Sequence, residues 1–330
     1  MSKLKLGIIG SNFVSDWLCE ATRLTEDFEL RAVFSRTAEK GNAFAEKHSI
    51  GKVYTDFEQF LSSDIDAVYI ASPNFAHAAQ AVAAAEHGKH VLCEKPVSSN
   101  LAEYRAMRRA AHEHKVVLLE AMRPAFDPAL EAVKRLLPKI GRIRRASFEF
   151  CQYSSRYDKY REGEILQAFK SEFSNAAVMD IGVYPIHFCL RLFGRPTGEV
   201  WSKSVILENG FEGSGEILLP YEGMTAVISY AKTFDSATPS IISGEDGSIL
   251  IDKMSAPRKI TLVPRKGEAE DIPFDFRENN MVFELSEFAR LIRTGSFVNE
   301  HEEFSEMELR LLDTVRKQNG IVFPADSPTV

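Results

Sequence analysis

Short apolar runs alternate with stretches of helical period along the first third of the chain. The runs predict buried strands at residues 4–9, 28–35, 53–55, 66–72, 89–95 and 116–122. The stretches between them place apolar residues at helical spacing and predict helices. Strands that lack apolar–polar alternation and are joined by helices are typical of a parallel sheet covered on both faces. We therefore expect a doubly wound α/β domain in residues 1–121, with its ligand at the carboxyl ends of the strands.

The pattern changes after Met122. A predicted helix at 128–137 and a strand at 142–153 precede a polar, aromatic stretch and a helix-like segment that ends near residue 193. A series of strands follows, and two helices at 281–293 and 304–318 close the chain. The strands are predicted at residues 200–207, 216–219, 226–231, 248–251 and 259–263. This order predicts an α+β domain, residues 122–330, with a large open and mainly antiparallel sheet.

The length, net charge and cysteine content of the chain exclude several classes of protein. A chain of 330 residues suits two domains, and a net charge of −7 argues against nucleic acid and anionic membranes as partners. The four cysteines lie far apart without a CxxC pair, which argues against a metal site and against disulfides and favours a reduced, cytoplasmic setting. The alanine-rich run at 78–88 is too short and too polar to span a bilayer.

The stretch GIIGSNFVSD, residues 7–16, follows the first predicted strand. Aligned with the dinucleotide fingerprint G-x-G-x-x-G, it keeps Gly10 and replaces the other glycines with Asn12 and Ser15. Asparagine enters the left-handed region more readily than most residues, and serine is small enough to pack against a strand. We expect Gly10, Asn12 and Phe13 to contact a dinucleotide; an ordinary strand–turn–helix connection is the alternative.

The second predicted strand ends in FSRT, with Ser35 where NAD-binding folds place a carboxylate for the ribose 2′-hydroxyl. Ser35 and the following Arg36 suit a 2′-phosphate, because no anion repels it and a guanidinium binds it in bidentate fashion. We therefore expect NADP as the cofactor, with NAD as the alternative.

Four stretches carry a family resemblance: GIIGSN, SPNFAH (72–77), CEKP (93–96) and AAVMDIGVYPIHFC (176–189). With them the chain resembles the glucose–fructose oxidoreductase and inositol dehydrogenase (Gfo/Idh/MocA) family nearly end to end. The resemblance implies a Rossmann domain, a sheet-based second domain for substrate binding and oligomerisation, and hydride transfer on sugars, polyols or related alcohols. The strand end FSR and the segment DIGVY resemble dimeric dihydrodiol dehydrogenases and NADP-linked sugar dehydrogenases.

Two departures leave the substrate open. The segment that precedes DIG is SNAAVMD, where family members commonly have a glycine-rich sequence. At residues 120–123 this chain has EAMR, where dihydrodiol dehydrogenases have a sequence similar to EAMW.

The resemblance points to Lys95, Tyr184 and Asp180 as the catalytic residues. Lys95 lies at the end of a predicted strand, and a neighbouring ammonium lowers the pKa of a phenol, so Tyr184 and Lys95 form a plausible acid–base pair. Asp180, Tyr184 and His187 are spaced i, i+4, i+7 and share one face of a helix, which Pro185 would kink or cause to begin there. We expect Asp180 to orient the pair. His187 is the alternative base, a substrate contact or a core residue.

The remaining cofactor contacts are predicted near the ends of the fourth and fifth strands. Asn74 is expected to cap the helix that follows the fourth strand, and His77 is either a cofactor contact or a structural residue. The set comprises Ser72, Pro73, Asn74, His77, Glu94 and Lys95.

Arg123 and the basic, aromatic segment 153–173 are candidate substrate contacts at the rim of a pocket, and a subunit contact is the alternative for the segment. An open apolar sheet face in the second domain predicts a homodimer or homotetramer. We expect an NAD(P)-dependent oxidoreductase acting on a hydroxyl or carbonyl of a small sugar, polyol or diol. The alternatives are a cofactor-sensing regulator of the same fold and an NAD-linked glycosidase.

Overall fold

The computed structural model describes residues 2–327, whose contacts divide them into two compact units. Unit 1 contains the chain up to Met122 together with Arg277–Glu306, and unit 2 contains Arg123–Phe276 together with the residues from Met307 onward. Near its end the chain therefore returns to unit 1. The division into functional domains 1–121 and 122–330 stays a prediction.

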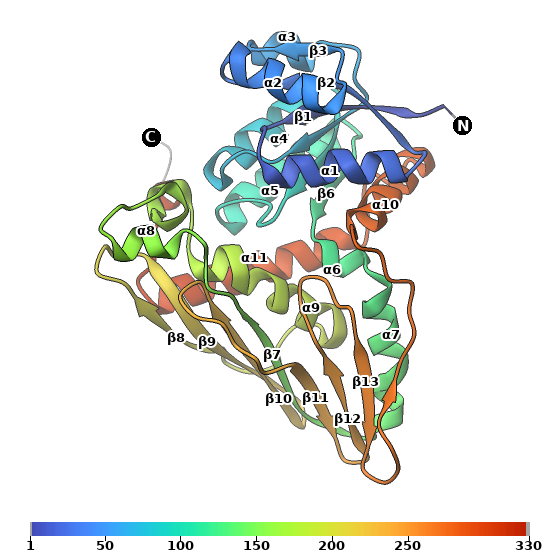
Figure 1. Cartoon of the computed structure of the whole chain (residues 1–330), viewed down its shortest axis with the longest axis vertical. Coiled ribbons are helices and arrows are strands. Elements are labelled where there is room, and N and C mark those ends of the chain that lie inside the picture. Colours follow the sequence, from blue (N-terminus) through green and yellow to red (C-terminus); the bar gives the residue numbers. More distant parts are fainter. Residues whose placement is uncertain (1, 328–330) are drawn as a thin grey trace. The chain divides into compact units, whose positions relative to one another are not determined.

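Unit 1 is built on a six-stranded parallel sheet, which confirms the predicted doubly wound fold (Figure 1). The strand order is β3-β2-β1-β4-β5-β6, the order of a dinucleotide-binding sheet. Because all neighbours run parallel, the carboxyl ends of the strands meet at one edge. The strands are β1 Leu4–Ile9, β2 Phe28–Phe34, β3 Lys52–Tyr54, β4 Ala67–Ile70, β5 His90–Glu94 and β6 Leu118–Ala121.

Polar caps begin several helices of unit 1, because a side-chain oxygen accepts from the first free amides of the helix. The capping residues are Asn12, Thr37, Asp56 and Asn100. The helices are α1 Phe13–Leu24, α2 Ala38–His48, α3 Phe57–Leu61, α4 His77–Glu86, α5 Leu101–Glu113 and α10 Met281–Thr294. Helix α10 packs against α1, and α4 packs against α5. Helix α11, His301–Gln318, begins in unit 1 and continues into unit 2.

Unit 2 contains an eight-stranded sheet in the order β14-β13-β12-β11-β7-β10-β9-β8. Strands β7 and β10 run parallel and the other neighbours are antiparallel, which confirms the predicted mainly antiparallel sheet. The strands are β7 Ile143–Cys151, β8 Trp201–Ile206, β9 Glu212–Tyr221, β10 Met224–Ala231, β11 Ser240–Gly244, β12 Gly247–Ile251, β13 Ile260–Pro264 and β14 Glu270–Asp271. The sequence pattern missed β14, which is two acidic residues long, and β11, whose apolar run is limited to Ile241 and Ile242 between serines.

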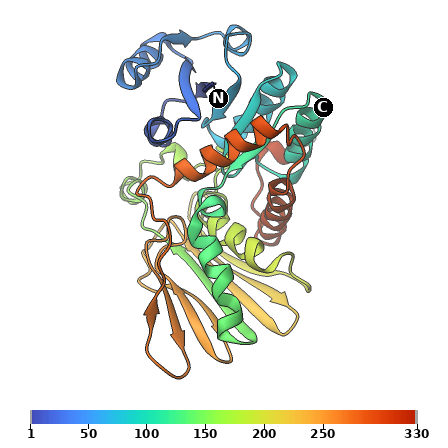
Figure 2. The ribbon, with the colours of Figure 1, turned by 90° about the vertical axis from the view of Figure 1, so that its right-hand side faces the viewer.

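Helices of unit 2 pack on one face of this sheet. Helix α7 contacts β13, and α9 contacts β7 and β10 (Figure 2). The helices are α6 Arg123–Phe126, α7 Pro128–Leu136, α8 Tyr157–Arg161 and α9 Val183–Phe193. The stretch Ser171–Phe193 is long and apolar enough to cross a membrane by length and composition, but 72% of its most apolar window is buried inside the fold. Burial to this extent is what a core segment of the fold shows.

Candidate active site

The loop after β1 turns sharply at Gly10, whose φ of +102° lies in the region that side chains rarely adopt. A Cβ at this position would lie 2.6 Å from the carbonyl oxygen of Ala71, so only glycine fits. The loop after β1 thus packs directly against the backbone after β4 at the carboxyl edge of the sheet, where such folds bind their ligands. A tight glycine turn at this place fits the predicted cofactor.

Asn12 does not take the left-handed conformation that we expected of it. Its φ is −120°, and it is instead the N-cap of α1. Its Oδ1 accepts from the amides of Val14 and Ser15 at 3.0 and 3.1 Å, and its Nδ2 donates to the carbonyl of Ala71 at 2.7 Å. Capping uses an extended residue, so the helix start decided its conformation. Asn12 thereby ties the first loop to the loop after β4.

Ser15 and Phe13 both lie in the first turn of α1, but Ser15 is buried and Phe13 is exposed. Ser15 is fully buried, and its hydroxyl donates to the carbonyl of Gly10 at 2.7 Å, so a small residue does pack where the fingerprint has glycine. Phe13 leaves 61% of its surface exposed at the start of the same helix.

Ser35 and Arg36 directly follow the last residue of β2. Ser35 is buried, and its amide donates to Tyr54 in the neighbouring strand at 3.0 Å. Arg36 is exposed and, within residues 2–327, makes no hydrogen bond or ion pair. The guanidinium is therefore available to an external anion.

His77 joins the loops after β4 and β5. His77 is 1% exposed, and its Nε2 lies 2.8 Å from the carbonyl oxygen of Ser72 and its Nδ1 3.0 Å from that of Pro96. Burial lowers the pKa of His77 below its ordinary value. The ring therefore fastens two segments of the predicted cofactor site to each other.

Asn74 is not the helix cap that we expected. A 3₁₀ turn, Asn74–Ala76, precedes α4, so the helix begins three positions later at His77 and its N-cap is Ala76. The hydroxyl of Ser72 in the same loop donates to Gln80 at 2.6 Å.

Lys95 follows the last residue of β5 and is half-buried. Its amide donates to the side chain of Glu94 at 3.3 Å, and its bond to Pro96 is cis. The carboxylate of Glu94 also accepts from the phenol of Tyr69 on β4. Lys95 therefore stands at the carboxyl edge of the sheet, where ligands of such folds bind.

A second carboxylate holds the backbone after Pro96. Glu120 on β6 is 4% exposed and accepts from the amide of Val97 at 3.0 Å and from the hydroxyl of Ser305 on α11 at 2.6 Å. A buried acceptor with two donors fixes the loop that follows Lys95.

Tyr184 lies at the start of α9, directly after a π-helical turn, Val178–Gly182. The α-helix begins at Val183, two residues before Pro185, and the π-helical turn runs directly into it, so the regular helix does begin near the proline. Tyr184 is 7% exposed, its ring lies 5.5 Å from that of Phe150, and the Arg123 guanidinium lies 5.9 Å from the ring centroid. Arg123 and Tyr184 are thus neighbours.

Asp180 lies within the π-helical turn and forms an ion pair with Lys232. Its Oδ2 lies 2.8 Å from the Nζ of Lys232, whose side chain is 4% exposed while that of Asp180 is 40% exposed. The pair thus has one buried end and one open end. Because turns of this type interrupt regular 3.6-residue spacing, they often mark functional sites.

The turn rests on a buried carboxylate of β9. Glu212 is fully buried and accepts from the amide of Val178 at 2.8 Å, the phenol of Tyr230 at 2.7 Å and the hydroxyl of Ser204 at 2.5 Å. Burial, only partly offset by these donors, raises the pKa of Glu212. Gly182 packs on the Tyr230 ring, where a Cβ would lie 3.0 Å from Cγ.

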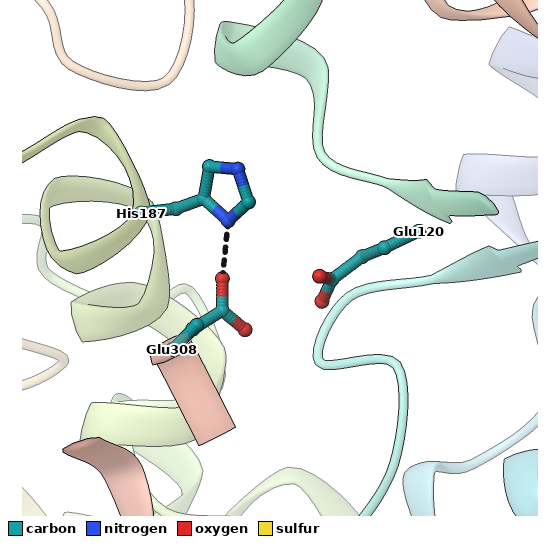
Figure 3. Close-up of side chains that lie close together, drawn as sticks. All are labelled: Glu120, His187 and Glu308. Atoms are coloured by element: carbon teal, nitrogen blue, oxygen red, sulfur yellow. Dashed lines mark hydrogen bonds and ion pairs between the residues drawn. The ribbon is translucent and has the colours of Figure 1, made fainter. Parts of the chain in front are cut away.

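His187 is buried one turn further along α9, with its Nδ1 2.6 Å from Oε2 of Glu308 on α11 (Figure 3). The ring is 3% exposed and the carboxylate fully buried. The pair joins two helices of unit 2.

The segment 153–173 folds into α8 and two short 3₁₀ turns, and its aromatic rings stack on one another. Tyr157 and Tyr160 lie 5.5 Å apart, and the ring of Phe169 lies 5.6 Å from each. Phe169 in turn contacts Phe211 at 5.0 Å. Among the basic residues, Lys159 pairs with Glu164 at 3.3 Å and Arg161 contacts the phenol of Tyr153 at 3.4 Å.

Sequence reasoning missed the side chains that support the candidate residues. Lys232, Glu212 and Glu120 are remote in sequence from the residues that they hold, and no local pattern marks them. A lysine at the end of the apolar strand TAVISYA is the one available signal for Lys232.

Two family models match the chain. The oxidoreductase family with an NAD-binding Rossmann fold, Gfo/Idh/MocA, matches residues 4–122, and a Gfo/Idh/MocA C-terminal domain matches residues 131–250. A solved structure has a similar fold. It is that of KijD10, a 3-ketoreductase from Actinomadura kijaniata in complex with NADP and TDP-benzene. It superposes with a TM-score of 0.84 at 22% identity, over 97% of this chain and 99% of that one. This likeness shows a shared fold.

Two curated relatives align along nearly the whole chain. The scyllo-inositol 2-dehydrogenase (NADP(+)) IolU of Bacillus subtilis is 42% identical over 326 residues, covering 98% of this chain and 99% of the relative. Trans-1,2-dihydrobenzene-1,2-diol dehydrogenase of Mus musculus is 27% identical over 341 residues, covering 98% and 99%. Since the alignments run from end to end and the sheets of both units agree with them, the chain belongs to the Gfo/Idh/MocA family of oxidoreductases.

Proposed function

We propose that this protein is an NADP-linked dehydrogenase or reductase that acts on a hydroxyl or carbonyl group of a sugar, polyol or diol. The observation that carries the proposal is the 42% identity, over 98% of the chain, to an enzyme named as an NADP(+)-dependent scyllo-inositol dehydrogenase. The match to a diol dehydrogenase over the same span supports the same reaction class.

The preference for NADP rests on the end of β2. The exposed guanidinium of Arg36 and the hydroxyl of Ser35 can bind a 2′-phosphate, and no carboxylate stands there to bind a 2′-hydroxyl instead. The other proposed cofactor contacts belong to the loops after β1, β4 and β5. They are Gly10, Asn12, Phe13, Ser72, Pro73, Asn74, His77, Glu94 and Lys95.

In the proposed reaction the bound nicotinamide supplies or accepts a hydride, and the chain's own residues move the proton. Tyr184 exchanges a proton between its phenol oxygen and the substrate hydroxyl. The ammonium of Lys95 favours the phenolate and donates to the reacting oxygen. Asp180 orients this pair, and its half-exposed carboxylate also accepts from a substrate hydroxyl. Arg123, beside Tyr184, and His187 are the further candidate substrate contacts.

The proposal extends to assembly and location. Helices α7 and α9 cover one face of the unit 2 sheet, and on the other face Trp201, Val205 and Leu218 are 63%, 60% and 40% exposed. Apolar side chains gathered on an open sheet face favour a partner, so we propose a homodimer or a homotetramer through this face. We also propose a cytoplasmic setting, because the four cysteines lie far apart in the sequence. The net charge of −7 supports a protein that binds neither nucleic acid nor membrane.

The test is a screen of sugars, polyols and diols with NADP and NAD, followed through the absorbance of the reduced nicotinamide. Oxidation of one substrate class with NADP is the expected result. If NADP(H) binds tightly and nothing in the screen turns over, the protein is a cofactor-sensing regulator. Release of free sugar from a glycoside without net reduction of the cofactor would instead identify a glycosidase.

A further inference from the structure

We propose that Lys232 is a positioning residue for the reaction proposed above: it fixes the carboxylate of Asp180 and couples the segment 153–173 to it. The inference rests on the proposed function, in which Asp180 accepts from a substrate hydroxyl. Lys232 follows the last residue of β10 and belongs to no motif of the sequence.

The first observation is the burial of a charged group. The side chain of Lys232 is 4% exposed, and an ammonium removed from water needs a partner of opposite charge and further acceptors. Asp180 supplies the charge at 2.8 Å, and the carbonyl oxygen of Ala168 accepts a hydrogen bond at 3.1 Å. The ring centroids of Phe169 and Phe211 lie 5.0 and 5.5 Å from Nζ, where an aromatic face attracts a cation.

The second observation is that Lys232 holds the segment 153–173 at both ends. Its carbonyl oxygen accepts from the amide of Ser154 at 2.9 Å, near the beginning of the segment. Its ammonium holds Ala168 and Phe169 near the end, where Phe169 carries the stack of Tyr157 and Tyr160. One residue therefore fastens the candidate substrate rim to the turn that carries Asp180.

The third observation is the open end of the pair. Asp180 keeps 40% of its side chain exposed although Lys232 is buried, so the carboxylate faces both a fixed charge inside and solvent outside. A carboxylate held by a buried cation keeps one orientation, which is what acceptance of a substrate hydroxyl requires. Because the Lys232 side chain is only 4% exposed, it acts through Asp180.

The experiment is a double-mutant cycle on kcat/KM with the substrate found in the screen, using Lys232→Met, Asp180→Asn and the two together. Lys232→Met removes the charge and keeps most of the side-chain volume. We expect it to lower kcat/KM by about 10- to 100-fold, the range of one hydrogen bond to a charged group. In the Asp180→Asn background the same change should cost less than about 3-fold, because the two residues act as a unit.

Two controls separate positioning from general loss of stability. Tyr221→Phe removes a part-buried polar contact of the same sheet, the 3.0 Å hydrogen bond from its phenol to the carbonyl oxygen of Gly194, and should leave kcat/KM unchanged. NADPH affinity should stay within about 2-fold in every variant, because the partners of Lys232 within residues 2–327 all belong to unit 2. If Lys232→Met does not fold, the cycle is run with Lys232→Arg, which keeps the charge but displaces it. Lys232→Arg should then lower kcat/KM in the protein that retains Asp180, but not in the Asp180→Asn background.

The outcomes keep the two proposals apart. Turnover by the unaltered protein with losses that multiply in the double variant, or with kcat/KM of Lys232→Met within about 2-fold of normal, would overturn the role of Lys232 and leave the proposed function standing. No turnover by the unaltered protein on any sugar, polyol or diol would overturn the proposed function, and the positioning role with it.

Discussion

The phenol of Tyr230 donates a 2.7 Å hydrogen bond to the carboxylate of Glu212, and both side chains are buried against the π-helical turn that carries Asp180. Glu212 also accepts from the amide of Val178 at the start of that turn. The geometry of the turn therefore depends on one carboxylate of the sheet. We therefore expect a substitution of Glu212 to lower the free energy of unfolding and to change the position of Asp180 in the candidate site.

Glu212→Ala leaves three buried donors without their acceptor and opens a cavity, so we expect it to lower the free energy of unfolding by about 3 kcal/mol. The matched control is Glu216→Ala on the same strand, an exposed carboxylate that accepts from Ser229 and should change stability by about 0.5 kcal/mol or less. Urea unfolding of both variants checks the prediction, and equal losses would contradict it.

Arg36→Ala should remove most of the preference for NADP over NAD. The guanidinium makes no hydrogen bond or ion pair within residues 2–327, so its loss should not disturb the fold, and one charge-assisted contact to a 2′-phosphate is worth about 1.5–3 kcal/mol. Titration should show NADPH binding weakened by about 10- to 100-fold with NADH binding unchanged. The control is Arg31→Ala on β2, where the guanidinium already contacts Asp64 at 3.2 Å. Equal affinities of the unaltered protein for the two cofactors would refute the assignment.

Tyr184→Phe keeps the ring against Phe150 and removes the phenol, so the fold and cofactor binding should survive. Turnover should fall by about 10²–10⁴-fold, the usual contribution of general acid–base catalysis. Lys95→Met should lose as much or more, and the double variant much less than the product of the two losses. Steady-state kinetics with the substrate found in the screen measures these losses. Near-normal turnover by Tyr184→Phe would show that Tyr184 is not the acid–base group and would make His187 the candidate.

Acid should destabilise the protein through His90. Burial lowers the pKa of this histidine from 6.5 to about 4, and its Nδ1 accepts from the amide of Val117 at 3.0 Å. The unfolded chain takes up a proton below about pH 6.5 and the folded chain does so only near pH 4. The stability that His90 contributes is thus fully present above about pH 6.5 and is lost as the pH falls toward 4, by at most about 3 kcal/mol.

Urea unfolding at a series of pH values measures this dependence. His90→Gln keeps an acceptor for Val117 without a titrating ring, and should flatten the fall in stability between about pH 6.5 and 4. The matched control is His114→Gln, which removes an exposed histidine and leaves the bond to Val117 in place. The same slope in unaltered protein and His90→Gln would show that His90 is not responsible.

Val205→Glu should dissociate the proposed homodimer. Val205 is 60% exposed on the edge strand β8, and a carboxylate buried there against a second copy would carry the cost of desolvation without a partner. Light scattering at micromolar concentration should show a dimer or tetramer for the unaltered protein and a monomer for this variant. Val298→Glu changes an equally apolar residue, 70% exposed in the loop between α10 and α11, and should leave the assembly intact. A monomer before any change would end the proposal.

The sequence alone determined the local elements and the class of both sheets. Unbroken apolar runs joined by helical stretches predicted the parallel sheet of unit 1, because burial on both faces imposes that pattern on each strand separately. Gly10 and Ser35 could be assigned to strand ends for the same reason, since the motif and the strand are adjacent in the chain. The resemblance to a family then selected Lys95 and Tyr184.

Only the tertiary structure decided which distant residues meet. It placed Lys232 against Asp180 and Glu212 under Val178, pairs separated by long stretches of chain whose composition gives no sign of them. It made Asn12 a helix cap, because the start of α1 and the carbonyl of Ala71 fixed that residue's backbone and side chain together. Periodicity reports whether a residue is buried. The choice of its partner depends on packing between elements, which no local pattern contains.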